Sequence, residues 1–417
     1  MNNKNALKSF VVWFCMAIFY FYCFIARSSF ITVLAKDFMK FYAIDAIGLS
    51  ALTSCYYWIY TGMQIPVGII CDKFSLRKTA TLMCLITAIG VFTIVATHSF
   101  YIAALGEMII GFGSAFAFIL CLKVITAWFP ENKIAIMSAY TMSLGGFGPV
   151  VGGPTVSFIT QKFMWRDVIM VFAGIGVLLA IAIYTIVRDH KAKAEVNEEH
   201  APIMESLKMI LKSKQAWILS LFTMALYSPL SALGDLWGVS FVETVFKADR
   251  GTATIASNMI YIGMVLGGPL MATLAVKLNS YKKVMLLGII SEAVCLGISI
   301  SIPETSIYIA FALLFATGIC SGAMLSYPLA LTLFPKRISA TVSGFVNMMS
   351  MVSGIILMPA FGFVLNMFWD GTIENGIKIY SAGDFKCGVI AVILFICVGV
   401  VITMFTKDRS PRAGEYS

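Results

Sequence analysis

The chain has 417 residues, of which 59% are hydrophobic and 12% are charged, and its formal net charge is +9. So apolar a composition excludes an ordinary water-soluble domain and favours a protein embedded in a membrane. The positive charge does not indicate a nucleic-acid partner, because most of the 30 lysines and arginines fall in the termini and in loops assigned to one side of a membrane. Since basic residues are retained on the cytoplasmic side, we expect both termini in the cytoplasm and the protein in a cell inner membrane.

Apolar stretches that could cross a bilayer as helices, which takes about 20 residues, follow one another along the whole chain. Twelve are predicted: 10–34, 46–71, 79–97, 100–127, 135–160, 167–187, 216–242, 252–277, 284–302, 306–332, 338–366 and 385–405. Basic residues precede the first stretch, as in a signal peptide, but no small-residue cleavage site follows, so we interpret it as a retained helix. The predicted fold is an all-α membrane protein with twelve transmembrane helices.

One long connection, 188–215, is charged, polar and poor in aromatic residues. It contains an amphipathic piece at 204–211, which predicts a cytoplasmic linker with a short surface helix. On either side of it the sequence repeats at a constant offset of 205 residues. The matching pairs are Tyr56 and Tyr261, Lys78 and Lys283, Gly113 and Gly318, Pro130 and Pro335, Ala135 and Ala340, Ser138 and Ser343, and Pro154 and Pro359. We therefore predict two homologous six-helix bundles, 1–187 and 216–417, the second ending in a short cytoplasmic tail.

A short charged loop joins the second and third stretches, in Gly68-Ile69-Ile70-Cys71-Asp72-Lys73-Phe74-Ser75-Leu76-Arg77-Lys78. It resembles the signature Gly-x-x-x-Asp-(Arg/Lys)-x-Gly-Arg-(Arg/Lys) of the major facilitator superfamily, with Ser75 where the family usually has Gly. The resemblance covers almost the whole chain and implies a carrier that works by alternating access. Asp72, Arg77 and Lys78 are then expected to form a gating latch that breaks and re-forms as the bundles rock. The alternative is that the loop is only a topology signal.

Charge inside a bilayer is costly, so each ionisable residue within a predicted span is a functional candidate. These residues are Arg27, Glu107, Lys123, Asp235 and Glu292. In the superfamily the first, fourth, seventh and tenth helices line the central cavity, and Arg27 in the first resembles the anion-binding arginine of organic-anion and phosphate-ester carriers. Its planar fork suits a carboxylate or phosphate, and a structural ion pair is the alternative.

Two carboxylates are the candidates for proton coupling. Glu107 stands where the superfamily often has Arg, in Arg-x-x-x-Gly-x-Gly, and a buried carboxyl there could take up and release a proton. Its depth in its span is close to that of Arg27, so a structural pair of the two is the alternative. Asp235 lies less than one turn from Ala232, the repeat counterpart of Arg27. Opposite charges are therefore expected to face one cavity, where their pairing could close the outer gate.

The other substrate-binding candidates are one lysine and a set of aromatic and amide side chains. Lys123 is predicted near the cytoplasmic mouth, where it could hold an anionic group or extend to the lipid headgroups. Tyr and Trp combine apolar area with one hydrogen-bonding group, which suits a small polar solute, although helix packing uses the same residues. The candidates are Tyr57, Tyr60, Gln64, Tyr227, Trp237, Tyr261 and Tyr327. Glu292 lies in the ninth helix, normally peripheral in the superfamily, and the sequence assigns it no function.

Two patterns bear on the direction of transport. Gly148-Pro149-Val150-Val151-Gly152-Gly153 matches the core of the Gly-Pro-x-x-Gly-Gly motif of drug–proton antiporters. The pattern through Tyr56-Tyr57 and Gln64-Ile65-Pro66-Val67-Gly68, together with the run from Phe118 to Phe129, is more similar to bacterial solute-uptake members. Those members include phagosomal nutrient transporters and, more distantly, a lysosomal dipeptide carrier.

The predicted function is proton-coupled uptake of a small polar or zwitterionic solute, such as an amino acid or a short peptide. The alternatives are a facilitative or exchanging organic-anion carrier, a drug–proton antiporter and, in another class, a non-transporting receptor. An enzyme is not expected, because no paired acids, metal ligands or nucleophile–base sets stand at recognisable spacing. We expect no cofactor and no metal, and a monomer whose partners are the solute, a coupling proton and the lipid bilayer.

Overall fold

The computed structural model describes residues 3–188, 203–301, 306–335, 338–374 and 376–409. The chain divides into two compact units. Unit 1 comprises residues 1–42 and 52–196, and unit 2 comprises residues 43–51 and 197–417. A short segment at the start of the second span therefore packs with the C-terminal unit, although most of that helix belongs to unit 1.

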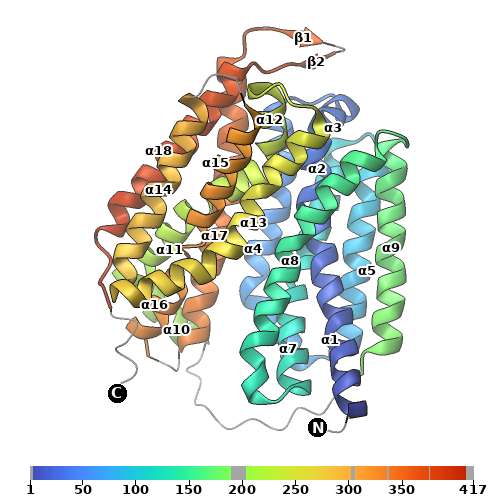
Figure 1. The fold of residues 1–417 in the computed structure, drawn as a ribbon. Helices are drawn as coiled ribbons and strands as arrows, with labels where there is room; N and C mark the ends of the chain where they lie inside the picture. The colour runs from blue at the N-terminus through green and yellow to red at the C-terminus, as the bar shows by residue number, and fades with distance from the viewer. Residues whose placement is uncertain (1–2, 189–202, 302–305, 336–337, 375, 410–417) are drawn as a thin grey trace. The chain divides into compact units, whose positions relative to one another are not determined.

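Unit 1 is helical throughout its described residues (Figure 1). Its elements are α1 (Asn3–Phe24), the π-helix η1 (Ile25–Ser29), α2 (Phe30–Val33), α3 (Ala35–Tyr42), α4 (Ala46–Lys73), α5 (Leu76–Val95), α6 (Phe100–Ala115), α7 (Ala117–Trp128), α8 (Glu131–Ile159) and α9 (Trp165–Ile186). Its core is formed mainly by apolar side chains from the first, third and fourth spans, with a few from the second, fifth and sixth, and α5 packs along both α6 and α9.

Unit 2 repeats this arrangement and adds one small hairpin. Its elements are α10 (Ile203–Lys212), α11 (Lys214–Leu226), the π-helix η2 (Leu230–Trp237), α12 (Gly238–Val245), α13 (Arg250–Leu278), α14 (Tyr281–Ser301), α15 (Ile307–Ser321), α16 (Ser326–Leu333), α17 (Ser339–Phe368), β1 (Ile373–Glu374), β2 (Ile377–Lys378) and α18 (Ala382–Thr403). The two strands pair antiparallel, with Ile373 opposite Lys378. The sequence did not predict this hairpin, whereas α10 covers the amphipathic piece expected at 204–211.

The predicted spans coincide with long helices. Ten helical stretches of the described residues are long and apolar enough to cross a membrane. The two remaining predicted spans, 46–71 and 135–160, coincide with α4 and α8, of 28 and 29 residues. The all-α prediction is confirmed.

Side-chain caps explain where several of these helices begin. The Ser75 hydroxyl accepts the backbone N–H of Lys78 at 3.3 Å and so starts α5. Asp249 caps α13 in the same way, and Ser381 and Asp384 form a reciprocal capping box at α18. Because Ser75 has a φ of −56°, its position does not require glycine, and the serine supplies a cap that glycine lacks.

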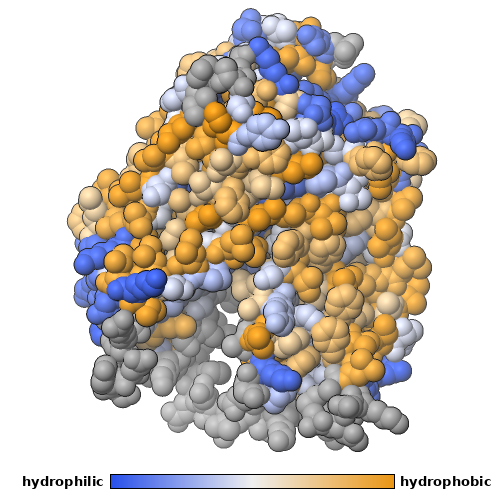
Figure 2. Space-filling view, viewed as in Figure 1, coloured by the Kyte–Doolittle hydropathy of each residue, from blue (hydrophilic) through white to orange (hydrophobic). Residues whose placement is uncertain are grey.

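The outer faces of the helices are apolar. On α9 the exposed fractions of Val171 and Leu178 are 65% and 67%, and Ile175 and Ile181 on the same helix are also exposed. Figure 2 shows apolar side chains over much of the helical surface, with hydrophilic ones gathered toward helix ends. Such a surface is unfavourable in water and matches the hydrocarbon of a bilayer, so the chain is a multi-pass membrane protein.

Irregular helix geometry is concentrated in four spans. The first and seventh contain π-helices, η1 and η2, whose first residues, Ile25 and Leu230, are related by the repeat offset. The fourth span is interrupted at Phe116, between α6 and α7, and the tenth at 322–325, between α15 and α16. These interruptions are again repeat-related, since Ser321 is the counterpart of Phe116. They fall in the four spans that the superfamily resemblance assigns to the cavity, where irregular backbone frequently marks function.

Candidate substrate-binding and proton-coupling site

Arg27 lies in the π-helical turn of the first span and is 4% exposed. Its guanidinium carbon is 4.7 Å from the centre of the Phe24 ring and 5.9 Å from that of Tyr57, which comes from α4. Helix α8 approaches this turn closely, because a Cβ added at Gly152 would lie 2.5 Å from the Ser29 hydroxyl oxygen. The glycines of the Gly-Pro-x-x-Gly-Gly match thus permit close packing of α8 on the segment that carries Arg27.

Aromatic rings of α4 continue from the arginine. Tyr56 and Tyr57 meet edge to face at 5.4 Å, and Tyr56 and Tyr60 stack at 5.5 Å. The Gln64 amide donates to the Tyr60 carbonyl at 3.4 Å. Opposite them, Gly111 of α6 lets the helices touch, since its Cβ would lie 2.4 Å from the Tyr56 carbonyl oxygen. The structure therefore brings Arg27 and Tyr57 together, with Tyr60 and Gln64 farther along the same helix.

Glu107 is fully buried on α6, and neither of its carboxyl oxygens has a hydrogen-bond partner among the described residues. In the described structure no hydrogen bond joins Glu107 to Arg27, so the pair that was the alternative role of Glu107 is not formed there. The guanidinium lies over the rings of Phe24 and Tyr57. An ionised carboxylate without a partner is very unfavourable in such a place, so Glu107 is expected to be neutral there.

The charged loop after α4 is held partly by backbone contacts. Lys123 of α7 donates through Nζ to the carbonyl of Cys71, the residue before Asp72. The Arg77 guanidinium lies 4.7 Å from the ring centre of Tyr184 on α9. The side chain of Asp72 is outside the described part of the structure, so the predicted latch stays a prediction. Lys123 is thus placed at the end of α4.

Asp235 lies in the second π-helix and is fully buried. Its Oδ1 accepts a hydrogen bond of 2.5 Å from the Tyr261 hydroxyl of α13. Two separate candidates of unit 2, the acid Asp235 and the tyrosine Tyr261, are therefore in contact, which the sequence did not predict. Since Tyr261 is the repeat counterpart of Tyr56, the two halves place a charged side chain and a tyrosine in related positions.

The other three candidates of unit 2 serve contacts within that unit. Trp237 is fully buried, donates to the Ser50 hydroxyl at 3.2 Å and stacks on Phe361 at 6.0 Å. The Tyr327 hydroxyl donates to Asn347 at 3.2 Å. Tyr227 caps the end of α11, and its carbonyl accepts from Ser231 at 3.1 Å. A role in substrate binding stays a prediction for each of them.

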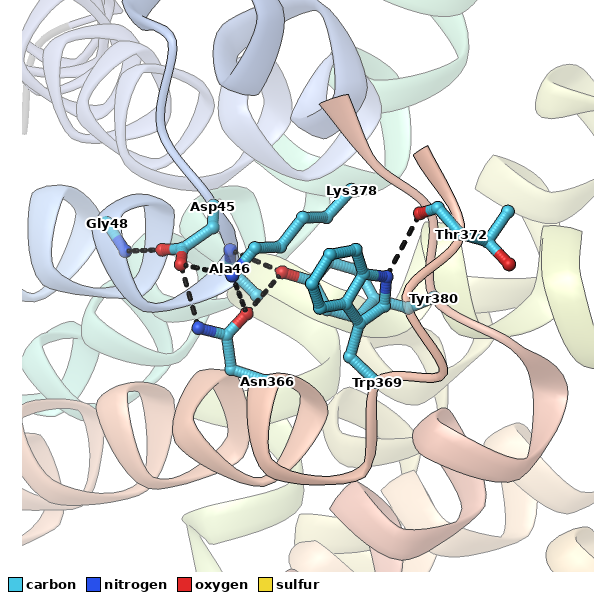
Figure 3. A network of polar contacts seen from close by, with 8 residues as sticks. All are labelled: Asp45, Ala46, Gly48, Asn366, Trp369, Thr372, Lys378 and Tyr380. Atoms are coloured by element: carbon cyan, nitrogen blue, oxygen red, sulfur yellow. Dashed lines mark hydrogen bonds and ion pairs between the residues drawn. The ribbon is translucent and has the colours of Figure 1, made fainter. Parts of the chain in front are cut away.

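Sequence reasoning missed a polar network in unit 2 (Figure 3). Asp45, just before α4, accepts from Lys378 of β2 at 3.1 Å and from the Asn366 amide of α17 at 2.7 Å. Tyr380 donates to Asn366 at 2.8 Å and accepts the Ala46 backbone N–H at 3.0 Å. Because Asp45 and Ala46 are more than 300 residues from the partners on α17 and in the hairpin, no local spacing could have identified the network.

Electrostatics favours the ionised form of Asp45, which lies outside the spans. Burial raises the pKa of Asp45, but hydrogen bonds from the Gly48 backbone, Asn366 and Lys378 outweigh burial. The pKa of Asp45 is therefore lower than that of an ordinary aspartate. Lys378 also lies 4.7 Å from the ring centre of Trp369, which holds the ammonium group on the network.

A comparison with protein families decides what this architecture is. The model described as Major Facilitator Superfamily matches residues 12–245, more than half of the chain. The chain belongs to the Major Facilitator Superfamily. It is accordingly a secondary transporter of a small solute and not an enzyme.

Relatives and solved structures of this superfamily resemble the chain over most of its length. An uncharacterised transporter, YybO, of Bacillus subtilis (strain 168) is 23% identical, with 82% of this chain and 85% of the relative covered. The probable galactarate/D-glucarate transporter GudP of Escherichia coli (strain K12) is 21% identical, with 92% of each covered. The crystal structure of a bacterial homologue of the human lysosomal transporter Spinster, inward-facing and unoccupied, matches with a TM-score of 0.80 at 17% identity, covering 95% of this chain and 96% of that one. At this identity the structure supports the fold alone.

Proposed function

We propose that this superfamily member carries a small organic anion and that Arg27 binds a carboxylate of the solute. The main support is that the Arg27 guanidinium is buried in a π-helical turn of the first span and flanked by the rings of Phe24 and Tyr57. A guanidinium can hold a carboxylate with two parallel hydrogen bonds, and such bonds are stronger where water is excluded. The likeness to a probable galactarate/D-glucarate transporter supports the same class of solute.

A zwitterionic solute, such as an amino acid or a short peptide, is the second candidate. It is supported by Asp235, a buried acid in the repeat-related turn, whose charge would suit an ammonium group. Neither sequence relative described above is named as an amino-acid carrier. The anion therefore takes first place, and the zwitterion is the alternative that a solute panel must separate from it.

Proton coupling is part of the proposal. Glu107 and Asp235 are the candidates, because both carboxyl groups are fully buried in spans with irregular helices. Alternating access changes the hydration of such groups, so an acid can load a proton on one side and release it on the other. We further propose a monomer in a cell inner membrane with cytoplasmic termini. In this proposal Asp72, Arg77 and Lys78 bias the rocking step.

The test is binding and uptake by purified protein in liposomes. D-Glucarate, choline and a neutral amino acid are compared as ligands that raise the melting temperature and as substrates driven by a pH gradient. We expect D-glucarate to stabilise the wild-type protein and Arg27→Lys to weaken that effect. Lysine keeps the positive charge but lacks the planar guanidinium that donates two parallel hydrogen bonds to a carboxylate. Arg250→Lys, at the partly exposed start of α13, is the matched control. Stabilisation by the amino acid alone would favour the zwitterion, and no flux of any solute would favour a receptor.

A further inference from the structure

Glu292 is a buried acid that the proposed cavity chemistry does not use. It lies on α14, the ninth span, and has no exposed surface. The Ser321 hydroxyl contacts its Oε1, and its Oε2 has no hydrogen-bond partner among the described residues. Glu292 takes no part in the Asp45–Lys378 and Arg250–Glu243 ion pairs. The carboxyl group is therefore held by one neutral partner inside a membrane-spanning unit.

Its partner stands at the point where the tenth span breaks. Ser321 is the last residue of α15, and the helix resumes as α16 only at Ser326. Helix α14 touches the break itself, because a Cβ added at Gly288, one turn before Glu292, would lie 2.5 Å from the Cβ of Ala323. The acid and the interruption of the tenth span thus form one local structure.

The hydrogen bonding of Glu292 favours a bound proton. The Ser321 hydroxyl donates to Glu292 Oε1 and also lies 3.1 Å from the Thr317 carbonyl oxygen. Within the described residues, no donor reaches Glu292 Oε2. A buried carboxylate with so few hydrogen bonds is very unfavourable, whereas in the neutral acid Oε2 carries the hydrogen.

The surroundings of Glu292 also disfavour a negative charge. The end of α15 carries the negative end of the helix dipole, which opposes an anion beside Ser321. Helices α13, α15, α16 and α18 pack on α14. Apart from Glu292 itself, the charged groups on these helices and α14 lie within the first or last five residues of a helix, and they are Arg250, Lys277, Lys282, Lys283, Asp384 and Lys386. The other titratable groups are Tyr261, Tyr281, Cys295, Tyr308, Cys320, Tyr327, Cys387 and Cys397. In the middle of these described helices, therefore, no cation could balance an ionised Glu292.

We propose that Glu292 is a proton-binding site that controls the break in the tenth span. With the proton bound, the carboxyl group bonds Ser321 and joins α14 to the end of α15. When the proton leaves, the charged carboxylate needs water at the unpartnered Oε2, and admitting that water between α14 and α15 loosens the break. The site is distinct from Glu107 and Asp235, and its occupancy would adjust a span that the superfamily places along the transport path.

The first test is infrared difference spectroscopy of the full chain in lipid vesicles without solute. At neutral pH we expect Glu292→Gln to remove one C=O stretching band of a protonated carboxylic acid. Ser321→Ala should keep that band but shift its frequency, because one hydrogen bond is lost. Glu107→Gln, a buried acid in the other unit, is the matched control and should remove a different band. Loss of a carboxylate band in Glu292→Gln, with the acid bands intact, would overturn the proposal.

The second test follows the break itself by hydrogen exchange and mass spectrometry. After correction for the intrinsic pH dependence of exchange, protection of residues 318–327 in the wild-type protein should fall as the pH becomes alkaline. Glutamine resembles the neutral acid, so Glu292→Gln should fold and lose this pH dependence. Equal pH dependence in both proteins would refute the link between the proton and the break. Since neither test uses a solute, both are independent of whether the solute is an organic anion.

Discussion

The first and seventh spans are built alike but carry opposite charges. Each contains a π-helical turn at the same register of the repeat, beginning at Ile25 in one half and at Leu230 in the other. The first turn holds Arg27 against the rings of Phe24 and Tyr57, and the second holds Asp235 against the Tyr261 hydroxyl. Both halves therefore share the position of the π-helical turn, whereas the charge of the side chain in that turn differs between them.

Repeat-related positions also carry opposite charges at the starts of the second and eighth spans. Asp45 precedes α4 and pairs with Lys378 at 3.1 Å, whereas its counterpart Arg250 starts α13 and pairs with Glu243 at 3.7 Å. In the third and ninth spans, Thr87 donates to its own helix at Met83, and its counterpart Glu292 contacts Ser321. A duplicated scaffold thus fixes where polar groups can be placed, and divergence sets their chemistry. Substitutions in one half can be compared with their counterparts in the other.

The largest expected effect is on binding at Arg27. Arg27→Gln removes a charged donor, and a hydrogen bond to a charged group contributes about 1.5–3 kcal/mol. We therefore expect the dissociation constant of a dicarboxylate such as D-glucarate to rise roughly 10- to 150-fold. Asp235→Asn should leave anion affinity within a few-fold of wild type. Competition binding in detergent measures both values, and equal losses in the two variants would contradict the assignment of the anion to Arg27.

Proton coupling is tested by comparing two modes of transport. Glu107→Gln and Asp235→Asn should lower accumulation driven by a pH gradient more than counterflow exchange, because exchange needs no net movement of protons. Gln and Asn match the neutral acids in shape, so expression and folding should be retained. Gradient-driven accumulation at the wild-type level in both variants would remove the proton-coupled mechanism and leave a facilitative anion carrier.

An effect of intermediate size is expected when alanine replaces either of two repeat-related glycines, Gly113 and Gly318, at close helix contacts. A Cβ at Gly318 would lie 2.1 Å from the nearest backbone atom, the Ile260 carbonyl oxygen. At Gly113 the nearest backbone atom is the Met83 carbonyl oxygen at 2.7 Å, and the closer contact at 2.3 Å is with the Thr87 side chain. Because the backbone clash is tighter at Gly318, Gly318→Ala should lower the melting temperature more than Gly113→Ala. Overpacking of this kind costs about 1–3 kcal/mol. Gly297→Ala, with open space around the added Cβ, is the control and should leave the melting temperature near the wild-type value.

The sequence predicted the membrane spans and the burial of charged side chains well, because both follow from chemistry that is local. Apolar length gives a span, and the cost of charge in lipid points to Arg27 and Asp235. Depth along a helix did not predict contact between side chains. Glu107 was placed at the depth of Arg27, yet neither of its carboxyl oxygens has a hydrogen-bond partner among the described residues.

Long-range partners were beyond prediction for a related reason. Ser321, the partner of Glu292, is an ordinary serine in an apolar run, and nothing in its neighbourhood indicates an acid from another helix. The π-helical turns and the break after Ser321 also left no clear signal, because the hydrophobic pattern continues through them. Their positions follow from packing against α8, α13 and α17, which a linear pattern does not contain.

The smallest expected effect concerns the ion pairs at the starts of the second and eighth spans. Asp45 accepts three hydrogen bonds, from Gly48, Asn366 and Lys378, whereas the Arg250–Glu243 contact is longer, at 3.7 Å. Asp45→Asn should therefore lower the melting temperature more than Arg250→Gln. Both effects should correspond to less than about 1 kcal/mol, since the groups are partly exposed and screened by water.

The pH dependence gives Asp45 a signature of its own. Because the pKa of Asp45 is lower in the folded protein than in the unfolded chain, the network stabilises the fold fully above the ordinary aspartate value of about 3.9. That contribution is lost as the pH falls through the lowered folded-state value, since the unfolded chain then binds the proton more readily. The difference in unfolding midpoint between wild type and Asp45→Asn should thus be constant from neutral pH down to mildly acidic pH and shrink below it. It should also shrink in high salt, because the Lys378 ammonium supplies part of it. A difference that grew on acidification would mean that Asp45 binds its proton more tightly in the folded state, and the network of Figure 3 would then not rest on an ionised aspartate.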